Sequence, residues 1–174
     1  MALVRILIDG YNLIHAWQRH RQTRDNHARS PRHNWPELAP GQARHSAAAR
    51  DALIRRLTLY QDAIGTPITV FFDGSGRTSG KPAASSKSEI EVLYSREGQT
   101  ADQMIERAVH RFEPYGAVLA VTDDHAERET VNSLGGSAAS CSNFIRDVED
   151  ALAELGDDIK HHNRRERHTF QQRK

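Results

Sequence analysis

The apolar residues of this chain alternate between strand-like and helix-like spacing from one end to the other. Five strands are predicted from short β-branched, alternating or apolar runs at 4–8, 67–72, 89–94, 117–121 and 137–140. Helical spacing predicts a helix that begins at Tyr11 and further helices over 47–64, 101–112, 124–134 and 143–155. Strands that alternate with helices predict an α/β fold, a three-layer sandwich around a mostly parallel central sheet.

Local signals set the ends of these helices. Thr100 and Gln103 have the spacing of a capping box, which predicts a helix start at residue 101. Gly65 follows the last apolar position of one long helix and is expected to end it. Gly156 has the same place after the final helix. We therefore expect one domain over residues 1–156.

Composition changes this picture once it is divided along the chain. Apolar residues make up 37% of the sequence and the mean hydropathy is −0.70, so part of the chain is expected to lie outside the core. The formal net charge is only +1, but residues 15–50 and residues 160–174 each carry +5, whereas residues 51–159 carry −9. We expect a basic insertion at about 18–45 and a basic, flexible tail over 157–174.

The sequence excludes several classes of protein. No apolar run approaches the roughly 18–20 residues of a membrane helix. Arg5 and Asp9 occupy a stretch that would be apolar in a signal peptide. Cys141 is the single cysteine, which excludes an internal disulfide framework and a cysteine-based zinc cluster. We therefore expect a cytoplasmic protein with no membrane partner.

Acidic residues gather where the predicted strands end. Two strands are followed directly by an aspartate, and a third is followed by Thr122 and then a pair of aspartates. One more aspartate and an asparagine fall in the first turn of following helices. In sheets of this kind the ligand site lies at the carboxyl ends of the strands. The candidates at this edge are Asp9, Asn12, Asp73, Asp102, Asp123 and Asp124.

Carboxylates gathered at one edge repel one another, so such a cluster normally binds cations. Hard oxygen ligands suit Mg²⁺ or Mn²⁺ rather than zinc. Each acid also has a purely structural interpretation. Asp9 and Asp73 precede glycine as in a turn, Asp102 suits a helix dipole, and Asp124 with Glu127 has N-cap spacing. The structural interpretation is strongest for Asp73, which leads into a glycine-rich loop.

Four segments occur in a specific order: Ile-Leu-Ile-Asp-Gly-Tyr-Asn-Leu-Ile at 6–14, Val-Phe-Phe-Asp-Gly at 70–74, Thr-Ala-Asp at 100–102 and Val-Thr-Asp-Asp at 121–124. Together they resemble the YacP-like NYN domain, a branch of the PIN-like nucleases, over about residues 3–155. The resemblance implies a Mg²⁺- or Mn²⁺-dependent ribonuclease with acidic ligands at Asp9, Asp102 and Asp124, assisted by Asn12. The family has Ser-Asp at 123–124, so Asp123 is a further candidate ligand, as is Asp73.

We therefore expect an endoribonuclease that hydrolyses phosphodiester bonds of mRNA or other cellular RNA, with the ribosome as a second candidate partner. The alternative is a catalytically inactive RNA-binding module of the same fold. Basic residues of the insertion, the glycine-rich loop and the tail are expected to hold the RNA backbone. They are Arg19, Arg21, Arg24, Arg44, Arg50, Arg77, Lys81, Lys87, Arg164, Arg165 and Arg167.

Two other phosphate-handling motifs do not match. Residues 75–82 look like a phosphate-binding loop, but Ser75 replaces its first glycine and Pro82 its final serine or threonine. A phosphatase of the haloacid dehalogenase type expects Asp-x-Asp after the first strand, where this chain has Asp9 and Tyr11. Tyr11 and Trp17 are candidates for base stacking, with core packing as the alternative for both.

Overall fold

The computed structural model describes residues 2–25, 46–74 and 90–171, with the backbone alone for residues 21–25 and 163–171. Its strands form one sheet in the order β3-β2-β1-β4-β5, and every neighbouring pair is parallel. The strands are β1 (Leu3–Asp9), β2 (Ile68–Phe72), β3 (Glu91–Tyr94), β4 (Ala117–Val121) and β5 (Ser137–Ala139). The predicted α/β fold with a parallel sheet is confirmed.

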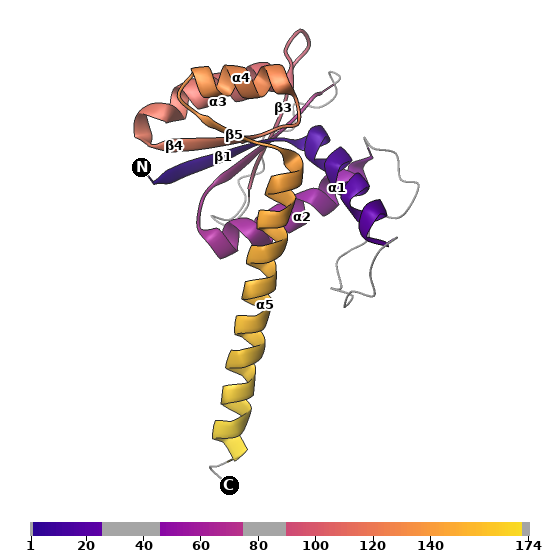
Figure 1. Cartoon of the computed structure of the whole chain (residues 1–174), viewed down its shortest axis with the longest axis vertical. Coiled ribbons are helices and arrows are strands. Elements are labelled where there is room, and N and C mark those ends of the chain that lie inside the picture. The colour runs from indigo at the N-terminus through magenta and orange to yellow at the C-terminus, as the bar shows by residue number, and fades with distance from the viewer. Residues whose placement is uncertain (1, 26–45, 75–89, 172–174) are drawn as a thin grey trace.

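Helices cover both faces of the sheet, which gives the three predicted layers (Figure 1). One face carries α3 (Ala101–Phe112) and α4 (His125–Ser133). The other face carries α1 (Gly10–Asp25), α2 (Ala47–Ile64) and α5 (Cys141–Gln171). Within the described residues, no helix combines the length and the apolar character needed to cross a membrane.

Alternate residues of the central strand β1 supply the two halves of the core. Ile6 and Ile8 pack into the cluster beneath α1, α2 and α5. Leu7 packs with Phe71 into the cluster beneath α3 and α4. Because helices cover both faces, the buried part of the strand, Ile6 to Ile8, is a continuous apolar run rather than an alternating one. The end of β1, and with it Asp9, is therefore held in a rigid part of the molecule.

Two glycines after β1 and β2 are required by close packing rather than by turn geometry. A Cβ atom on Gly10 would lie 2.3 Å from the Phe72 ring, and one on Gly74 would lie 2.6 Å from the backbone oxygen of Ser95. Neither glycine has a positive φ. The Asp9-Gly10 pair therefore leads directly into helix α1, so its interpretation as a turn dipeptide is wrong.

Helix α1 extends further than the sequence pattern indicated. The insertion was expected to interrupt it at residue 18, but its backbone stays helical through Asp25. Two of the added residues contact the rest of the domain, since Arg19 lies 3.0 Å from Asp123 and His20 lies 3.2 Å from Glu149 of α5. Residues 26–45 of the expected insertion lie outside the described residues.

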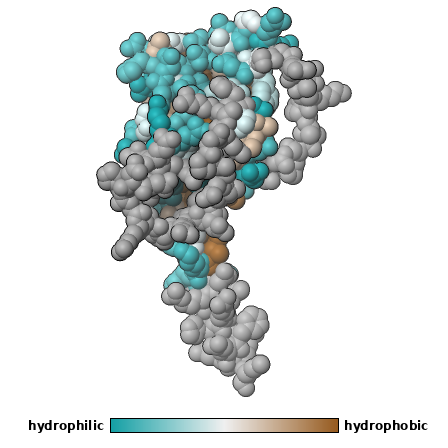
Figure 2. All heavy atoms as spheres, turned by 90° about the vertical axis from the view of Figure 1, so that its right-hand side faces the viewer, coloured by the Kyte–Doolittle hydropathy of each residue, from teal (hydrophilic) through white to brown (hydrophobic). Residues whose placement is uncertain are grey.

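Helix α5 also continues beyond its expected end. Gly156 keeps helical backbone without the positive φ that Gly65 adopts after α2, and the helix runs through Gln171. This half of α5 leaves the body of the molecule (Figure 1), and Figure 2 shows hydrophobic surface where it does so. Leu155 and Ile159 are exposed there. The backbone of residues 157–171 is thus helical, and both the flexibility of the tail and the division of the chain at residue 156 stay predictions.

Candidate functional site

The carboxyl ends of β1, β2 and β4 bring the candidate residues together. In the sheet register Asp9 pairs with Phe71, and Ile8 pairs with Val121. Residues that follow these strands therefore flank Asp9 on both sides. The order of the strands places β1 between β2 and β4, so acids that are far apart in sequence meet at one edge.

Asn12 holds the carboxylate of Asp9. The Asn12 backbone N–H donates to Asp9 Oδ1 at 2.9 Å, and its side-chain Nδ2 donates to Asp9 Oδ2 at 2.7 Å. The same Nδ2 lies 3.3 Å from the Thr122 hydroxyl, just after β4. Asn12 therefore fixes the orientation of an acid at the centre of the site.

Three carboxylates converge around this point. Asp9, Asp102 and Glu127 each offer an oxygen, and these oxygens all lie within 4.8 Å of one another. Asp102 stands in the first turn of α3, and Glu127 in the first turn of α4. Glu127 is only 3% exposed, and neither of its carboxylate oxygens has a hydrogen-bond partner among the described residues.

Burial is the main reason why all three acids resist ionisation. It raises the pKa of Asp9, although hydrogen bonds from Asn12 partly oppose the rise. It also raises the pKa of Asp102, and the negative charges of Asp9 and Asp124 add to the effect. Burial raises the pKa of Glu127 to about 8, with the nearby Thr122 hydroxyl opposing part of the rise and Asp102 increasing it. A bound cation would offset these penalties.

The donor set fits a hard divalent cation. All three groups supply carboxylate oxygen, the ligand that Mg²⁺ and Mn²⁺ prefer over sulfur or imidazole. Buried polar atoms are normally satisfied in proteins, and the two unpartnered oxygens of Glu127 are groups that a cation would satisfy. Asp9, Asp102 and Glu127, which we call the carboxylate triad, can therefore hold a metal ion.

Asp124 and Asp123 are engaged in capping helices. Asp124 Oδ1 accepts from the backbone N–H groups of Ala126 (2.8 Å) and Glu127 (3.1 Å), so Asp124 is the N-cap of α4. Asp123 Oδ1 accepts from the Cys141 N–H at 2.9 Å at the start of α5, and its other oxygen pairs with Arg19. The structure thus brings Glu127, rather than Asp124, to Asp9 and Asp102. Metal binding by Asp123 or Asp124 stays a prediction.

Asp73 lies on the opposite side of Asp9 and joins β2 to α3. Its Oδ1 accepts from the backbone N–H of Ala101 at 2.7 Å and lies 3.3 Å from the Ser95 hydroxyl. The structural interpretation of Asp73 thus has direct support, although its role is helix positioning rather than a turn. A role in metal binding stays a prediction for this residue.

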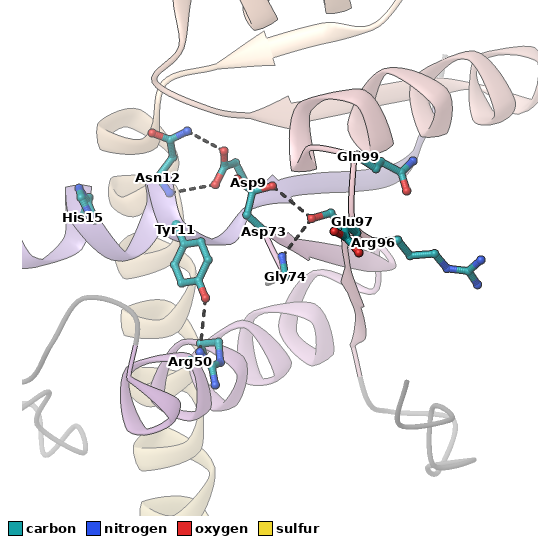
Figure 3. A pocket seen from close by; sticks show the side chains of 12 residues that line it. Asp9, Tyr11, Asn12, His15, Arg50, Asp73, Gly74, Arg96, Glu97 and Gln99 are labelled. Atoms are coloured by element: carbon teal, nitrogen blue, oxygen red, sulfur yellow. Dashed lines mark hydrogen bonds between the residues drawn. The ribbon is translucent and has the colours of Figure 1, made fainter. Parts of the chain in front are cut away.

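A pocket of about 740 Å³ opens beside Asp9 (Figure 3). One wall comes from α1 and α2, and the other from the end of β2 and the turn between β3 and α3. The lining residues are Asp9, Tyr11, Asn12, His15, Arg50, Asp73, Gly74, Ser95, Arg96, Glu97, Gly98 and Gln99. Asp9 belongs both to this pocket and to the carboxylate triad, so the two are parts of one site.

The basic residues expected to bind RNA lie in different parts of the chain, and the structure describes only some of them. Arg50 lines the pocket, and Arg19 is an exposed side chain that pairs with Asp123. The helical backbone of α1 or α5 carries Arg21, Arg24, Arg164, Arg165 and Arg167, whose side chains are outside the described part. The residues Arg44, Arg77, Lys81 and Lys87 lie outside the described residues altogether. Trp17 is buried in the core, which confirms the packing alternative for it.

Glu127 is a site residue that was not predicted, although its position in the sequence carries a signal. Asp124 and Glu127 have the spacing of an N-cap box, in which the later acid would turn back to the backbone of the cap. The cap does form through Asp124, but the Glu127 side chain points into the buried edge instead. The feature that identifies Glu127 is an acid that faces the core from the first turn of a helix, where that helix follows a strand ending at the site.

The sequence as a whole matches the model of one protein family. The model for the YacP-like NYN domain matches residues 6–174. This chain belongs to the YacP-like NYN domain family. Membership confirms the resemblance inferred from the four motif segments, and it places the chain among proteins with a PIN-like nuclease fold. The family suggests ribonuclease activity, with RNA as the implied substrate.

Three similar proteins or structures from Bacillus subtilis agree with this membership. An uncharacterized protein YacP of Bacillus subtilis (strain 168) is 28% identical over 145 residues, which cover 83% of this chain and 74% of that protein. The crystal structure of a tryptophan-to-leucine mutant of Rae1 (YacP) from Bacillus subtilis has a TM-score of 0.64 and 25% identity over 90% of this chain and 81% of that one. A second Rae1 (YacP) crystal structure has a TM-score of 0.65 at 23% identity, over 92% and 81%, and supports the fold.

Proposed function

We propose that this protein is a divalent-metal-dependent endoribonuclease that hydrolyses phosphodiester bonds of mRNA or other cellular RNA. The observation that carries the proposal is the carboxylate triad. Three acids with raised pKa values converge within 4.8 Å, and one of them is buried with both oxygens unpartnered. A structural role alone does not account for such a group, because hydrogen-bonding partners would stabilise it at lower cost.

Each residue of the site has a role in this chemistry. Asp9, Asp102 and Glu127 would hold Mg²⁺ or Mn²⁺ as ligands, and Asn12 keeps both oxygens of Asp9 in place. When bound, such an ion lowers the pKa of a water molecule and neutralises charge on the phosphate oxygens. Hydrolysis joins the water oxygen to phosphorus and breaks the bond to the 3′ oxygen, leaving a 5′-phosphate and a 3′-hydroxyl.

Basic residues at the periphery are needed because the site itself is acidic. The carboxylate triad and Asp73 repel a phosphate chain in the absence of a cation. The two segments of net charge +5 supply the opposite charge, and RNA binding through them is expected to weaken steeply with salt. The ribosome remains a proposed partner and the cytoplasm a proposed location, the latter because the single Cys141 is a free thiol.

The first test is metal-dependent cleavage by variants of the triad. Asp9→Asn, Asp102→Asn and Glu127→Gln are expected to lower cleavage of a long RNA in Mn²⁺ by about a hundredfold or more, because each removes a metal ligand. Asp62→Asn is the matched control, since Asp62 is exposed near the far end of α2 and is expected to leave the rate unchanged. The rate is measured on a gel with a 5′-labelled RNA.

The same experiment decides between the enzyme and the inactive RNA-binding module. If the wild type cleaves no faster than the triad variants in Mg²⁺ or Mn²⁺, while all of them bind RNA equally, the enzyme is ruled out and the binding module remains. Loss of activity in Asp9→Asn and Asp102→Asn but not in Glu127→Gln would support a metal centre without this glutamate. Asp124→Asn, tested alongside, decides whether Asp124 also contributes.

A further inference from the structure

The pocket beside Asp9 has opposite charges at its two ends. Asp9 and Asp73 lie together at one end, and the Tyr11 side chain extends from there toward Arg50 at the other end (Figure 3). Arg50 Nη1 donates to the Tyr11 hydroxyl at 3.4 Å. Among the lining residues the other arginine, Arg96, is exposed, and its side chain points away from Asp9 in Figure 3. Arg50 is therefore the cationic group placed to face a ligand that also reaches Asp9.

This arrangement fits a ligand with two anionic groups. One group would be drawn to a cation at the carboxylate triad, and the other to the guanidinium of Arg50. A nucleotide within an RNA strand has this pattern, because a phosphate flanks it on each side. Pockets that bind small ligands have volumes of about 300–1,000 Å³, and the 740 Å³ of this one is within that range. The guanidinium has five donors, so it can bind Tyr11 and a phosphate together.

The local packing holds this wall of the pocket in place. The Tyr11 ring meets the buried Phe72 ring edge to face, with centroids 5.0 Å apart, and Phe72 in turn stacks on Tyr94. Arg50 stands in the first turn of α2, whose start is fixed by the Ser46 N-cap. Tyr11 packs against the same core cluster that buries Ala49, the neighbour of Arg50, so the separation of the two side chains is set by the core.

We propose that this pocket binds the nucleotide next to the scissile phosphate of an RNA strand, with Arg50 holding its outer phosphate and Tyr11 positioning Arg50. This inference rests on the proposed ribonuclease function for the identity of the strand. It goes beyond that function because it assigns one nucleotide subsite and the path that the RNA strand follows across the protein, from the carboxylate triad toward α2. Arg50 is a binding residue here, and Tyr11 is a positioning residue.

The test compares Arg50→Ala with a matched control on the same helix. Arg55→Ala removes the same charge from an exposed position outside the pocket. Binding of a labelled single-stranded RNA of about 10 nucleotides is measured in Ca²⁺, with its integrity checked on a gel, between about 50 and 200 mM salt. Arg50→Ala is expected to weaken binding about tenfold and to reduce the salt slope by about 0.7, whereas Arg55→Ala changes neither. Thermal melting checks that both variants are folded.

The Tyr11→Phe variant tests whether Tyr11 positions Arg50. It keeps the ring against Phe72 and removes only the hydroxyl, so its effect on affinity is expected to be about threefold, smaller than that of Arg50→Ala. In the double variant the loss is expected to equal that of Arg50→Ala alone, because Tyr11 acts through Arg50. Independent, multiplying losses would show that Tyr11 does not position the arginine. In cleavage assays Arg50→Ala is expected to raise KM with kcat nearly unchanged.

The outcomes separate this inference from the ribonuclease function. If the wild type cleaves RNA in Mn²⁺ but Arg50→Ala binds and cleaves as Arg55→Ala does, the subsite is overturned and the enzyme stands. If no metal supports cleavage but Arg50→Ala still lowers affinity and salt slope, the enzyme is overturned and the pocket stands as an RNA-binding site. Absence of RNA binding by the wild type would overturn the subsite.

Discussion

Glu127 is the residue at which the site departs furthest from an ordinary protein interior. It lies buried in the first turn of α4, close to two further acids. Neither of its oxygens has a partner at hydrogen-bond distance among the described residues, and the nearby Thr122 hydroxyl offsets only part of the cost of burial. Asp9 at its side differs, because Asn12 satisfies both of its oxygens. Asp9 is therefore held in position by hydrogen bonds, whereas the Glu127 oxygens can still take a ligand. This combination is suited to binding a cation.

The raised pKa of Glu127 predicts how stability depends on pH without metal. The folded state favours the protonated acid, with a pKa of about 8 against the ordinary 4.5 of a solvated glutamate, because burial disfavours the charge. With respect to Glu127, the free energy of unfolding is thus greatest below about pH 4.5 and decreases as the pH rises toward 8. Glu127→Gln removes this loss, which has an upper bound of about 5 kcal/mol. Chemical denaturation in EDTA is expected to show the variant more stable than wild type at pH 8 and equal to it near pH 4.5.

Glu129→Gln is the control for this prediction, because Glu129 lies exposed on the same helix. It is expected to leave the pH profile of stability unchanged. Asp9 and Asp102 also have raised pKa values and keep some loss of stability at higher pH in every variant. A Glu127→Gln protein that is less stable than wild type at pH 8 would mean that the glutamate has partners that stabilise its charge.

How far single residues could be predicted depended on whether their role was local. Asp9, Asp102 and Asn12 follow strands or start helices, so the edge that they share could be predicted from spacing alone. The inward direction of Glu127 could not, because the same Asp124-x-x-Glu127 spacing fits a capping box with an outward glutamate. Only packing of α4 against the sheet decides between the two. The Asn12 contacts likewise depend on the turn of α1 directly after β1.

The start of α3 connects helix capping with the site. Thr100 accepts from the Gln103 N–H, and the Gln103 side chain accepts from the Thr100 N–H, so the predicted capping box is confirmed. Asp73 accepts from the next N–H, that of Ala101. Asp102 lies within this first turn of α3. Its backbone is therefore positioned both by the Thr100 cap and by Asp73, which follows β2. Loss of the cap should therefore affect both stability and metal binding.

Thr100→Ala tests this connection. The variant is expected to lose about 1 kcal/mol of unfolding free energy, because the Gln103 backbone N–H at the start of α3 loses its acceptor, the Thr100 hydroxyl. Thr58→Ala is the control: the Thr58 hydroxyl donates to the Ile54 carbonyl inside α2, and its removal is expected to cost under about 0.5 kcal/mol. Urea denaturation measures both. Equal losses would show that the capping box adds nothing to the start of α3.

The ends of elements were predicted less well than their centres. Ala47–Ile64 and Ala101–Phe112 match the expected helices because a serine or threonine cap and, for α2, a left-handed glycine mark their ends locally. Helix α5 passes through Gly156, since a glycine inside a helix costs only about 1 kcal/mol and need not end it. Helix α1 passes residue 18 because Arg19 and His20 pair with acids of the body, contacts that no local pattern reveals.

The whole molecule is expected to be stabilised by metal through the carboxylate triad. Mn²⁺ at a hundred times its Kd would add about 2.7 kcal/mol, which raises Tm by about 5–10 °C for a domain of this size. The increase is expected to be larger at pH 8 than at pH 6, because the cation must displace protons from acids with raised pKa values. Differential scanning fluorimetry measures it.

Asp102→Asn is expected to remove most of this thermal shift, and Asp62→Asn to retain it in full. Because the readout is a melting temperature, it does not depend on cleavage. A shift of the same size in both variants would place the metal outside the triad. A shift that is larger at pH 6 than at pH 8 would contradict proton displacement from the three acids.

The central position of β1 also governs when the site can form. This strand is synthesised before both strands that it pairs with, β2 on one side and β4 on the other, and its Asp9 meets Glu127 only after α4 exists. At a synthesis rate of about 5–20 residues per second, that delay is on the order of ten seconds. A nascent chain that ends before α4 contains no complete carboxylate triad. The newly made protein thus acquires its proposed catalytic centre only after the ribosome has translated α4.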